Sequence, residues 1–295
     1  MIPPSELPIN EDGSVFHLHL RPEHLAERVI LVGDQGRVAM VASFFDEIEC
    51  DIQSREFHTI TGTYKGKRIS CVSTGIGCDN IDIVMTELDA LVNIDLVNRR
   101  EKEQLTQLTL VRIGTCGGLQ PFVRLGSFIA SVKSIGFDGL LNYYEGRDEV
   151  CDLELEEAFK KHMAWDNKKG SPYVATADEE LIDRVAGDDM FRGITIACGG
   201  FYGPQGRFVR LVPKDYEQNL KVESFSYQDP KHPDADPLMV CNFEMESSAL
   251  AGMSALLGHK AMTCCMVVAD RYTTKMNTEY KSSMSDLIKL VLDRI

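Results

Sequence analysis

The chain has 295 residues, of which 44% are hydrophobic, 26% charged and 8% aromatic. This composition is typical of a globular protein and excludes disordered and collagen-like chains. The formal net charge is −14 and the sequence has no long basic run, which argues against nucleic acid as a partner. An anionic small molecule would need a local cluster of Arg side chains or backbone N–H groups to overcome the repulsion by the net negative charge of the chain.

The nine cysteines are scattered along the chain without a CxxC pair. An odd number at such spacing predicts reduced, mostly buried thiols and neither a disulfide framework nor a structural zinc site. The N-terminal segment is polar and proline-rich, and no stretch of 18 apolar residues follows it. We therefore expect a cytoplasmic protein without a membrane partner.

The first half of the chain alternates short apolar runs with amphipathic segments. The periodicity predicts helices over 36–45 and from Asp79 or Asn80 to about 91. It predicts strands over 28–32, 56–64, 68–73 and 109–113. The last of these strands is expected to open into a glycine-rich loop over 114–118.

The second half repeats this alternation, with strands over 174–176, 193–197, 238–243 and 261–268 and helices over 178–186, 246–257 and 278–294. Such an order predicts a largely parallel sheet covered by helices on both faces. No break in composition divides the chain, so we expect a single domain over 1–295. Two polar stretches, 93–107 and 221–237, are interpreted as insertions or surface loops; the first is expected to be a solvated helix or an edge used in assembly.

Three glycine-bearing loops, 33–37, 74–77 and 114–118, follow predicted strands. Ligands bind at that edge of open α/β sheets, and backbone N–H groups at helix starts suit phosphate oxygens. Any one such loop more often only makes a tight turn, and none completes the GxGxxG pattern of dinucleotide sites. Arg37 and Arg112 favour an anion, because a buried guanidinium needs an anionic ligand or an acidic partner. Both explanations of these arginines stay open.

A second candidate segment, 199–208, combines glycines, Phe201, Gln205 and Arg207. Gln offers a donor and an acceptor and Arg offers donors, which suits the two carbonyls and the N–H of a uracil-like ring. Glu244 and Glu246 lie at the predicted start of a helix. They either favour its macrodipole or accept hydrogen bonds from sugar hydroxyls, and periodicity does not decide between these roles.

Two further pairs of polar residues stand out. His17 and His19 lie in an alternating run, VFHLHL, that is expected to send both imidazoles to one face of a strand. Exposed strand histidines explain this pair better than a metal site. Asp270 and Arg271 follow a buried strand and mark either the edge of a site or a local ion pair.

Eight segments in order resemble the nucleoside phosphorylase family, and within it the enzymes that cleave uridine. They are VFHLHL (15–20), the strand with GDQGR (28–37), SREFHT (54–59), STGIG (73–77), VRIGTCGG (111–118), FYGPQGR (201–207), NFEMESSAL (242–250) and VVADR (267–271). The resemblance covers 15–295. It implies an α/β fold: a single three-layer domain whose central mixed, partly barrel-like sheet is flanked by helices.

The resemblance implies reversible phosphorolysis of uridine to uracil and ribose 1-phosphate, a step in pyrimidine salvage. Inorganic phosphate would be a co-substrate, no organic cofactor would be needed, and the chain would act as a homodimer at least. The implied phosphate site consists of Gly33, Arg37, Arg112, Thr115 and, from a neighbouring subunit, Arg55. A monovalent cation such as potassium would bind at Glu56 and Ser73.

The same resemblance implies a nucleoside site in which Arg112, Arg207 and Glu246 are catalytic. His17 of the neighbouring subunit would face the ribose 5′-hydroxyl, Glu246 would hold the ribose hydroxyls, and Arg207 would bind the pyrimidine. The remaining members of this site are Phe201, Gln205, Glu244, Met245, Asp270 and Arg271.

These roles match the charges of the reaction. Cleavage of the glycosidic bond builds positive charge on the ribose and negative charge on the departing base, so it needs an anion beneath the sugar and donors at the base. Phosphate is the anion beneath the sugar, and Gln205 and Arg207 are the donors at the base. A protein nucleophile is then not required.

Asp270 is the position that departs from the family pattern. Purine-specific members carry an Asp there, and bacterial members that cleave uridine more often carry Asn. A purine or broad-specificity phosphorylase is therefore the main alternative. A nucleosidase that uses water, and a non-catalytic nucleoside-binding relative, are weaker ones. The choice between a dimer and a hexamer stays open.

Overall fold

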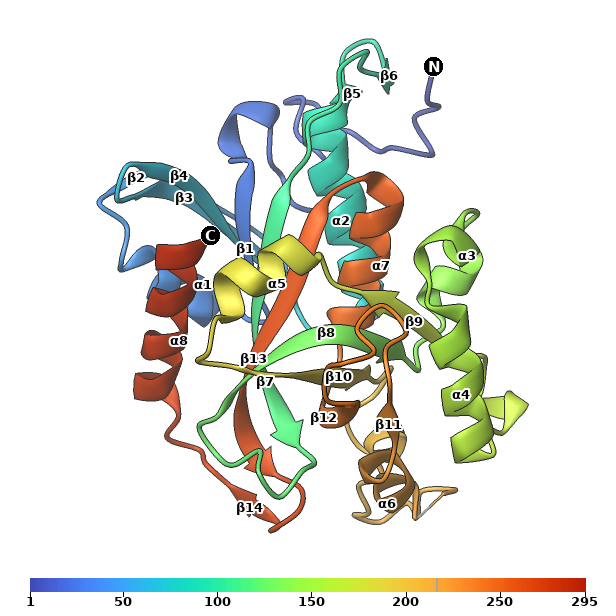
Figure 1. Cartoon of the computed structure of the whole chain (residues 1–295). Helices are drawn as coiled ribbons and strands as arrows, with labels where there is room; N and C mark the ends of the chain where they lie inside the picture. Colours follow the sequence, from blue (N-terminus) through green and yellow to red (C-terminus); the bar gives the residue numbers. More distant parts are fainter. Residues whose placement is uncertain (216) are drawn as a thin grey trace.

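The computed structural model describes residues 1–215 and 217–295 and is built around a mixed sheet of twelve strands (Figure 1). In sheet order ten of the strands are β11 (Ser226–Tyr227), β12 (Leu238–Glu244), β10 (Phe191–Ala197), β8 (Phe128–Gly136), β13 (Lys260–Asp270), β7 (Thr109–Gly118), β1 (Arg28–Val32), β4 (Lys67–Ser73), β3 (Phe57–Tyr64) and β2 (Glu47–Ser54). The other two are β9 (Tyr173–Thr176), which pairs with β8, and β14 (Lys275–Met276), which pairs with β13.

Five of these strands close into a ring. β7 pairs with β13 in parallel and with β12 in antiparallel orientation, and β10 and β8 complete the circle. Side chains from four of the ring strands, among them Cys116, Ile129, Cys241 and Cys265, pack together in one buried cluster. The mixed, partly barrel-like sheet implied by the resemblance is therefore confirmed. The prediction of a largely parallel sheet from the order of the elements is wrong, because the sheet also contains the antiparallel hairpins of β2, β3 and β4 and the antiparallel pairs of β8 with β9 and β13.

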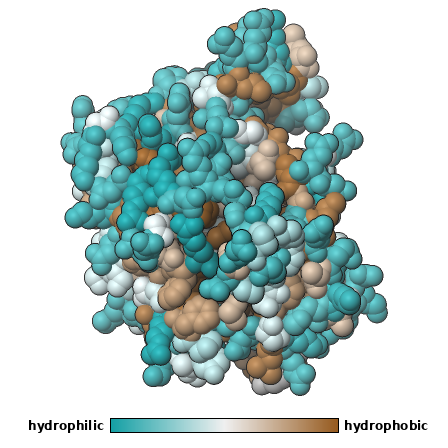
Figure 2. All heavy atoms as spheres, viewed as in Figure 1, coloured by the Kyte–Doolittle hydropathy of each residue, from teal (hydrophilic) through white to brown (hydrophobic). Residues whose placement is uncertain are grey.

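Helices cover both faces of the sheet, as predicted (Figure 1). On one face lie α1 (Gln35–Ala42), α5 (Glu179–Ala186) and α8 (Lys281–Arg294), and on the other α2 (Cys78–Asn93) and α7 (Ser247–Leu257). The short α3 (Arg147–Val150), α4 (Leu153–Met163) and α6 (Gln218–Glu223) complete the α-helices of the described residues. In the part of the chain that the structure describes, no helix has the length and hydropathy needed to cross a membrane. Figure 2 shows one face on which hydrophilic residues dominate and hydrophobic residues form separate patches.

Local sequence signals explain where the helices begin. The carboxylate of Asp34 accepts a hydrogen bond from the backbone N–H of Arg37, and that of Asp178 accepts one from Leu181, so each caps the first turn of its helix. α7 consists largely of Ala, Ser and Gly, and its first two turns are buried. Such small side chains let the helix lie close to α2 and to the ring.

The segment from Gly114 to Gly118 is a strand and not the loop expected from its glycines. β7 continues through Gly118 because β13 and β12 pair with its last residues. The glycines serve close packing: a Cβ atom at Gly118 would lie 2.9 Å from the carbonyl oxygen of Val123. A Cβ atom at Gly114 would lie 2.9 Å from Cys265 Sγ.

Two other local predictions are wrong. Residues 15–20 form a turn and not a strand, because the N–H groups of His17 and Leu18 bind Glu87 in place of a neighbouring strand. The imidazoles of His17 and His19 consequently have different partners, Glu87 and Asp12.

The stretch 93–107 contains no helix beyond the end of α2. It forms a hairpin of two short strands, β5 (Ile94–Asp95) and β6 (Arg100–Glu101), which projects from the body near the N-terminus (Figure 1). Arg99 anchors the hairpin to the N-terminal segment, because its guanidinium donates hydrogen bonds to backbone carbonyl oxygens of residues 2, 3 and 7. The sequence pattern also failed to indicate β2, β8, α3, α4 and α6.

The ring tolerates little extra volume where β10 meets β12. A Cβ atom at Gly193 would lie 2.3 Å from Cys241 Sγ and 2.9 Å from the carbonyl oxygen of Met239. We expect Gly193→Ala to lower the free energy of unfolding by about 1 to 3 kcal/mol, measured by urea denaturation. Gly203→Ala is the control, because a Cβ atom there has no described neighbour within 4 Å. Equal stability of the two variants would contradict this account of the closure.

Candidate active site

A cavity of about 350 Å³ opens where the carboxyl ends of several ring and sheet strands meet. Gly33 follows β1, Thr115 lies in β7 and Val268 in β13, while the segment after β10 and the start of α7 close the other sides. The strand-end location predicted from the glycine loops is therefore correct for the loops after β1 and β4. The lining residues are Gly33, Asp34, Arg37, Ile76, Arg112, Thr115, Cys116, Gly117, Phe201, Gln205, Arg207, Phe243, Glu244, Met245, Glu246, Val268, Ala269, Met276 and Tyr280.

Arg112 is the central charge of this cavity. Its guanidinium donates a short hydrogen bond to Glu246 and lies 3.3 Å from a carboxylate oxygen of Glu244, and all three side chains are at least 95% buried. Burial alone would lower the pKa of Arg112, but the two carboxylates raise it above its ordinary value, so the guanidinium stays charged. The Nε atom of Arg112 is buried without a hydrogen-bond partner among the described residues. It is available to an acceptor that enters the cavity.

The two glutamates have different environments. The Glu244 carboxylate accepts hydrogen bonds from the N–H groups of Glu246 and Ser247 and from the Ser247 hydroxyl, at 2.6 to 3.0 Å. It thereby provides an acceptor for backbone N–H groups at the start of α7 that have no partner within the helix. Glu246 accepts one hydrogen bond, of 2.8 Å, from the N–H of Gly77 beside its contact with Arg112. Glu244 therefore mainly binds backbone N–H groups at the start of α7. Glu246 lines the cavity together with Met245.

A second guanidinium in the cavity lining is suited to an anion. The nearly buried guanidinium of Arg37 lies 3.2 Å from the Asp34 carboxylate and donates to the carbonyl oxygen of Ile113 at 3.3 Å. Gly33 and Thr115 also line the cavity. Four of the five residues predicted to bind phosphate, Gly33, Arg37, Arg112 and Thr115, thus line the same cavity.

The far end of the cavity consists of the segment after β10. The Arg207 guanidinium lies 4.0 Å from the centroid of the Phe201 ring, and its Nη2 atom lies 3.5 Å from Gln205 Oε1. Burial and the nearby charge of Arg271 lower the pKa of Arg207 to about 10. A site that holds two guanidinium groups in partial burial favours an electron-rich ligand.

Asp270 and Arg271 lie behind this end and not in the lining. The Asp270 carboxylate accepts hydrogen bonds from the N–H groups of Tyr272 and Thr273, at 3.0 and 2.8 Å. Burial acts to raise its pKa, but these hydrogen bonds outweigh it and lower the pKa. Arg271 donates to the carbonyl oxygen of Gln205 at 3.2 Å and so supports the segment that carries Gln205.

Arg55 and His17 lie together on the surface, outside the lining of this cavity. The Arg55 guanidinium is 5.3 Å from the centroid of the Phe16 ring, and the Phe16 and His17 rings are 4.9 Å apart. Arg55 has a positive φ of 56° in the exposed turn between β2 and β3. A cation and an imidazole are therefore presented outward as one cluster.

Glu56 and Ser73, the predicted monovalent-cation pair, are close to each other. The Ser73 hydroxyl donates to the backbone carbonyl oxygen of Glu56 at 2.9 Å and accepts from the N–H of His58 at 2.8 Å. The hydroxyl oxygen keeps a second lone pair, which is available to a cation without the loss of either bond. Within residues 1–215 and 217–295, no group of three His, Cys, Asp or Glu side chains has the arrangement of a metal site.

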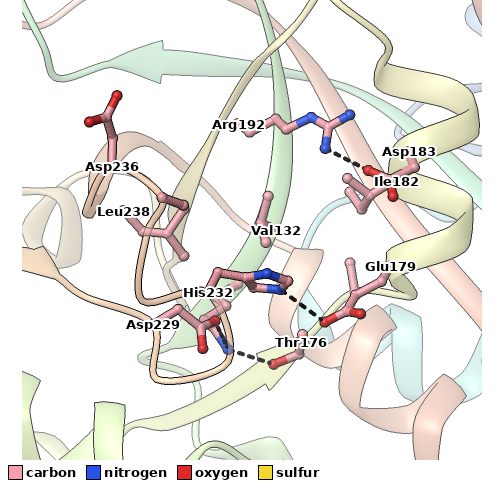
Figure 3. Close-up of a pocket in the computed structure, with 13 residues that line it drawn as sticks. Val132, Thr176, Glu179, Ile182, Asp183, Arg192, Asp229, His232, Asp236 and Leu238 are labelled. Carbon is pink, nitrogen blue, oxygen red and sulfur yellow. Dashed lines mark hydrogen bonds and ion pairs between the residues drawn. The ribbon is translucent and has the colours of Figure 1, made fainter.

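A second cavity of about 270 Å³ lies between α5, β8 and the segment before β12 (Figure 3). Its basic side chains already have acidic partners: Arg192 with Asp183 at 2.6 Å, Lys133 with Asp229 at 3.1 Å and His232 with Glu179 at 3.7 Å. The space between these pairs is lined by apolar residues such as Val132 and Leu238. It offers no wall of grouped arginines comparable to that around Arg112, so the first cavity is the better candidate.

The sequence indicated most of the polar lining and the apolar members Phe201 and Met245, but it assigned no role to the other apolar members. Ile76 and Phe243 lie within the STGIG and NFEMESSAL segments without a predicted contact, and Met276 and Tyr280 lie outside every quoted segment. Only the path of the chain brings these side chains to the cavity.

Comparison with known proteins shows which families and sequences this chain resembles. The family model described as the phosphorylase superfamily matches residues 27–292. A uridine phosphorylase of Thermococcus kodakarensis is 29% identical over 282 residues, which is 92% of this chain and 83% of the relative. A purine nucleoside phosphorylase of Anoxybacillus flavithermus is 25% identical over 281 residues, 94% of this chain and 97% of the relative.

Among solved structures, a nucleoside phosphorylase of Trypanosoma brucei described as showing uridine phosphorylase activity superposes with a TM-score of 0.86. It is 28% identical, and the match covers 98% of both chains.

Burial raises the pKa of Glu244 above its ordinary value, and Arg112 and the hydrogen bonds from Ser247 oppose this shift. The Glu244 carboxylate thereby holds Arg112 and the start of α7 at the same time. We expect Glu244→Gln, which keeps the shape but removes the charge, to lower the free energy of unfolding by about 1 to 3 kcal/mol in urea denaturation. The matched change Glu103→Gln at an exposed position should leave it within about 0.5 kcal/mol. Indistinguishable stabilities would show that the Glu244 charge is not needed.

Proposed function

The chain belongs to the phosphorylase superfamily, and from this premise we propose that its cavity catalyses the phosphorolysis of uridine to uracil and ribose 1-phosphate. One observation carries the proposal: two arginines suited to an anion, Arg37 and Arg112, line the same cavity as Gln205, Arg207 and Glu246. A phosphate, a ribose and a base therefore each meet groups of suitable chemistry.

Phosphate is the nucleophile in this proposal. Arg112 and Arg37 neutralise its charge through charge-assisted hydrogen bonds, and Thr115 and the backbone at Gly33 fix its orientation beneath the sugar. Since Glu246 accepts a hydrogen bond from Arg112, phosphate shares that guanidinium with the carboxylate. No organic cofactor takes part, because the attacking oxygen comes from the co-substrate.

The ribose and the base carry the charges that develop as the glycosidic bond breaks. Glu246 accepts hydrogen bonds from the ribose hydroxyls, and Met245 packs against the sugar. As the glycosidic bond breaks, the electrons pass to the base, and Arg207 and Gln205 stabilise the uracil anion at its oxygens. The Phe201 ring lies against Arg207 at the mouth of this end and is placed to cover the base.

We propose a pyrimidine and not a purine as the preferred base. Gln205 and Arg207 are two directed groups that suit the edge of a uracil ring. Asp270, the residue that could favour purines, has its carboxylate bound to the N–H groups of the turn that follows it. A carboxylate held in that way is poorly placed to protonate a purine.

We further propose that two copies of the chain share each site. Arg55 and His17 lie outside the cavity of their own chain, yet they present a cation and an imidazole side by side. In a two-fold dimer each copy would offer this cluster to the cavity of the other. A cytoplasmic location fits the nine cysteines, all of which are free thiols in the structure.

Removal of Arg207 tests the base end. Arg207→Ala should reduce kcat/KM for uridine roughly 100-fold, because a donor at the developing anion is lost. Arg210→Ala, an exposed change three residues away, is the control and should leave the rate unchanged. Uracil release is followed with and without phosphate. An unchanged uridine rate in Arg207→Ala, inosine cleaved much faster than uridine, or full release without phosphate would each contradict the proposal.

Mixing of two inactive variants tests the shared site. Arg112→Ala damages the cavity of its own chain, and Arg55→Ala damages that of the neighbour. A mixed dimer then holds one intact site, so co-refolding equal amounts should restore roughly a quarter of wild-type uridine phosphorolysis. Activity that stays at the level of the separate variants would contradict a site built from two chains.

A further inference from the structure

Glu87 is a buried carboxylate that the proposed reaction does not use. It lies in α2 with about 5% of its surface exposed. Its oxygens accept hydrogen bonds from the N–H of His17 at 2.9 Å, from the N–H of Leu18 at 2.8 Å and from Nδ1 of the His17 ring at 2.6 Å. One side chain thus holds both the backbone and the imidazole of a segment 70 residues earlier.

This contact determines which nitrogen of His17 carries the proton. A carboxylate only accepts hydrogen bonds, so the Nδ1 atom that faces Glu87 must be the donor. In the neutral ring Nε2 is then left as an acceptor. The side chain of His17 is 28% exposed, so part of the ring can be reached from outside.

The surroundings of the ring keep it in place. The Phe16 ring packs edge-on against the imidazole, with an interplanar angle of 84°, and the Arg55 guanidinium lies 5.3 Å from the centroid of the Phe16 ring. The backbone bonds to Glu87 hold residues 16–18 in a turn, and the bond from Nδ1 to the same carboxylate holds the imidazole itself. The Nε2 atom of His17 therefore points in a fixed direction.

We propose that Glu87 is a positioning residue that fixes the tautomer and orientation of His17, so that Nε2 accepts a hydrogen bond from the 5′-hydroxyl of a nucleoside in the partner's cavity. The inference rests on the proposed function. It makes the site selective for substrates with a donor at the 5′ carbon. Glu87 acts through His17 and does not touch the nucleoside.

Glu87→Gln is the informative change because it keeps the size of the side chain. The glutamine amide would place an N–H donor toward Nδ1 or toward the backbone N–H groups, so the imidazole would lose its anchor or take the opposite tautomer. We expect kcat/KM for uridine to fall roughly three- to tenfold, the effect of one neutral hydrogen bond. For 5′-deoxyuridine, which lacks the hydroxyl, it should stay at the wild-type value.

His17→Ala should give the same pattern, and the double variant should show no further loss for uridine. Glu103→Gln, an exposed change of the same type, should alter neither substrate. Equal losses for uridine and 5′-deoxyuridine in Glu87→Gln would show that the residue only holds the fold and would overturn the inference. So would an unchanged rate for both substrates.

Nitrogen-15 NMR of the histidine rings in the wild-type protein gives a readout that needs no variant to fold. We expect the His17 resonance of a neutral ring protonated at Nδ1, and a ring protonated at Nε2 would overturn the inference. If the wild-type protein cleaves no uridine, the proposed function fails, while the NMR result still decides the role of Glu87.

Discussion

The structure depends on a cation sealed against two carboxylates where the ring of strands closes. Arg112 projects from β7, Glu244 ends β12, and Glu246 stands at the start of α7. A buried ion pair is stable only if every charge has partners, and loss of one partner leaves an uncompensated charge. The three side chains therefore fix the positions of β7, β12 and α7 relative to one another. They also determine the charge at the centre of the cavity.

The ring brings this cluster to the edge where the other groups end. The pairing of Gly117 and Gly118 with Phe243 and Asn242 lets β7 approach β12 closely. β1 pairs with the first part of the same edge of β7 and delivers Gly33 and Arg37, while the segment after β10 delivers Gln205 and Arg207. Groups for an anion and for a polar ring thus face one space, although the chain separates them by more than 150 residues.

Most of the polar site could be predicted from the sequence, because its residues lie in short motifs next to strongly periodic elements. The prediction failed at Gly114–Gly118, where five residues with three glycines suggested a loop; strand pairing on both sides outweighs the weak propensity of glycine. It also failed to assign Glu244 to the cap of α7, since a carboxylate at that position suits a helix terminus and a ligand equally well.

Long-range contacts account for what the sequence could not reveal. Nothing near VFHLHL indicates that Glu87 binds its backbone, and so the alternating pattern was misread as a strand. Alternation predicts a strand only when the N–H groups have no stronger acceptor, and here a buried carboxylate provides one. Ile76 and Tyr280 reach the cavity only through the fold.

A crystal structure of the protein with phosphate and uracil is the most direct measurement of the central claim. The account predicts phosphate in contact with Arg112 and Arg37 and uracil held by Gln205 and Arg207, with an imidazole from a second copy at the open side. Phosphate bound elsewhere, for instance between the ion pairs beside α5, with the space around Arg112 left to solvent, would contradict it.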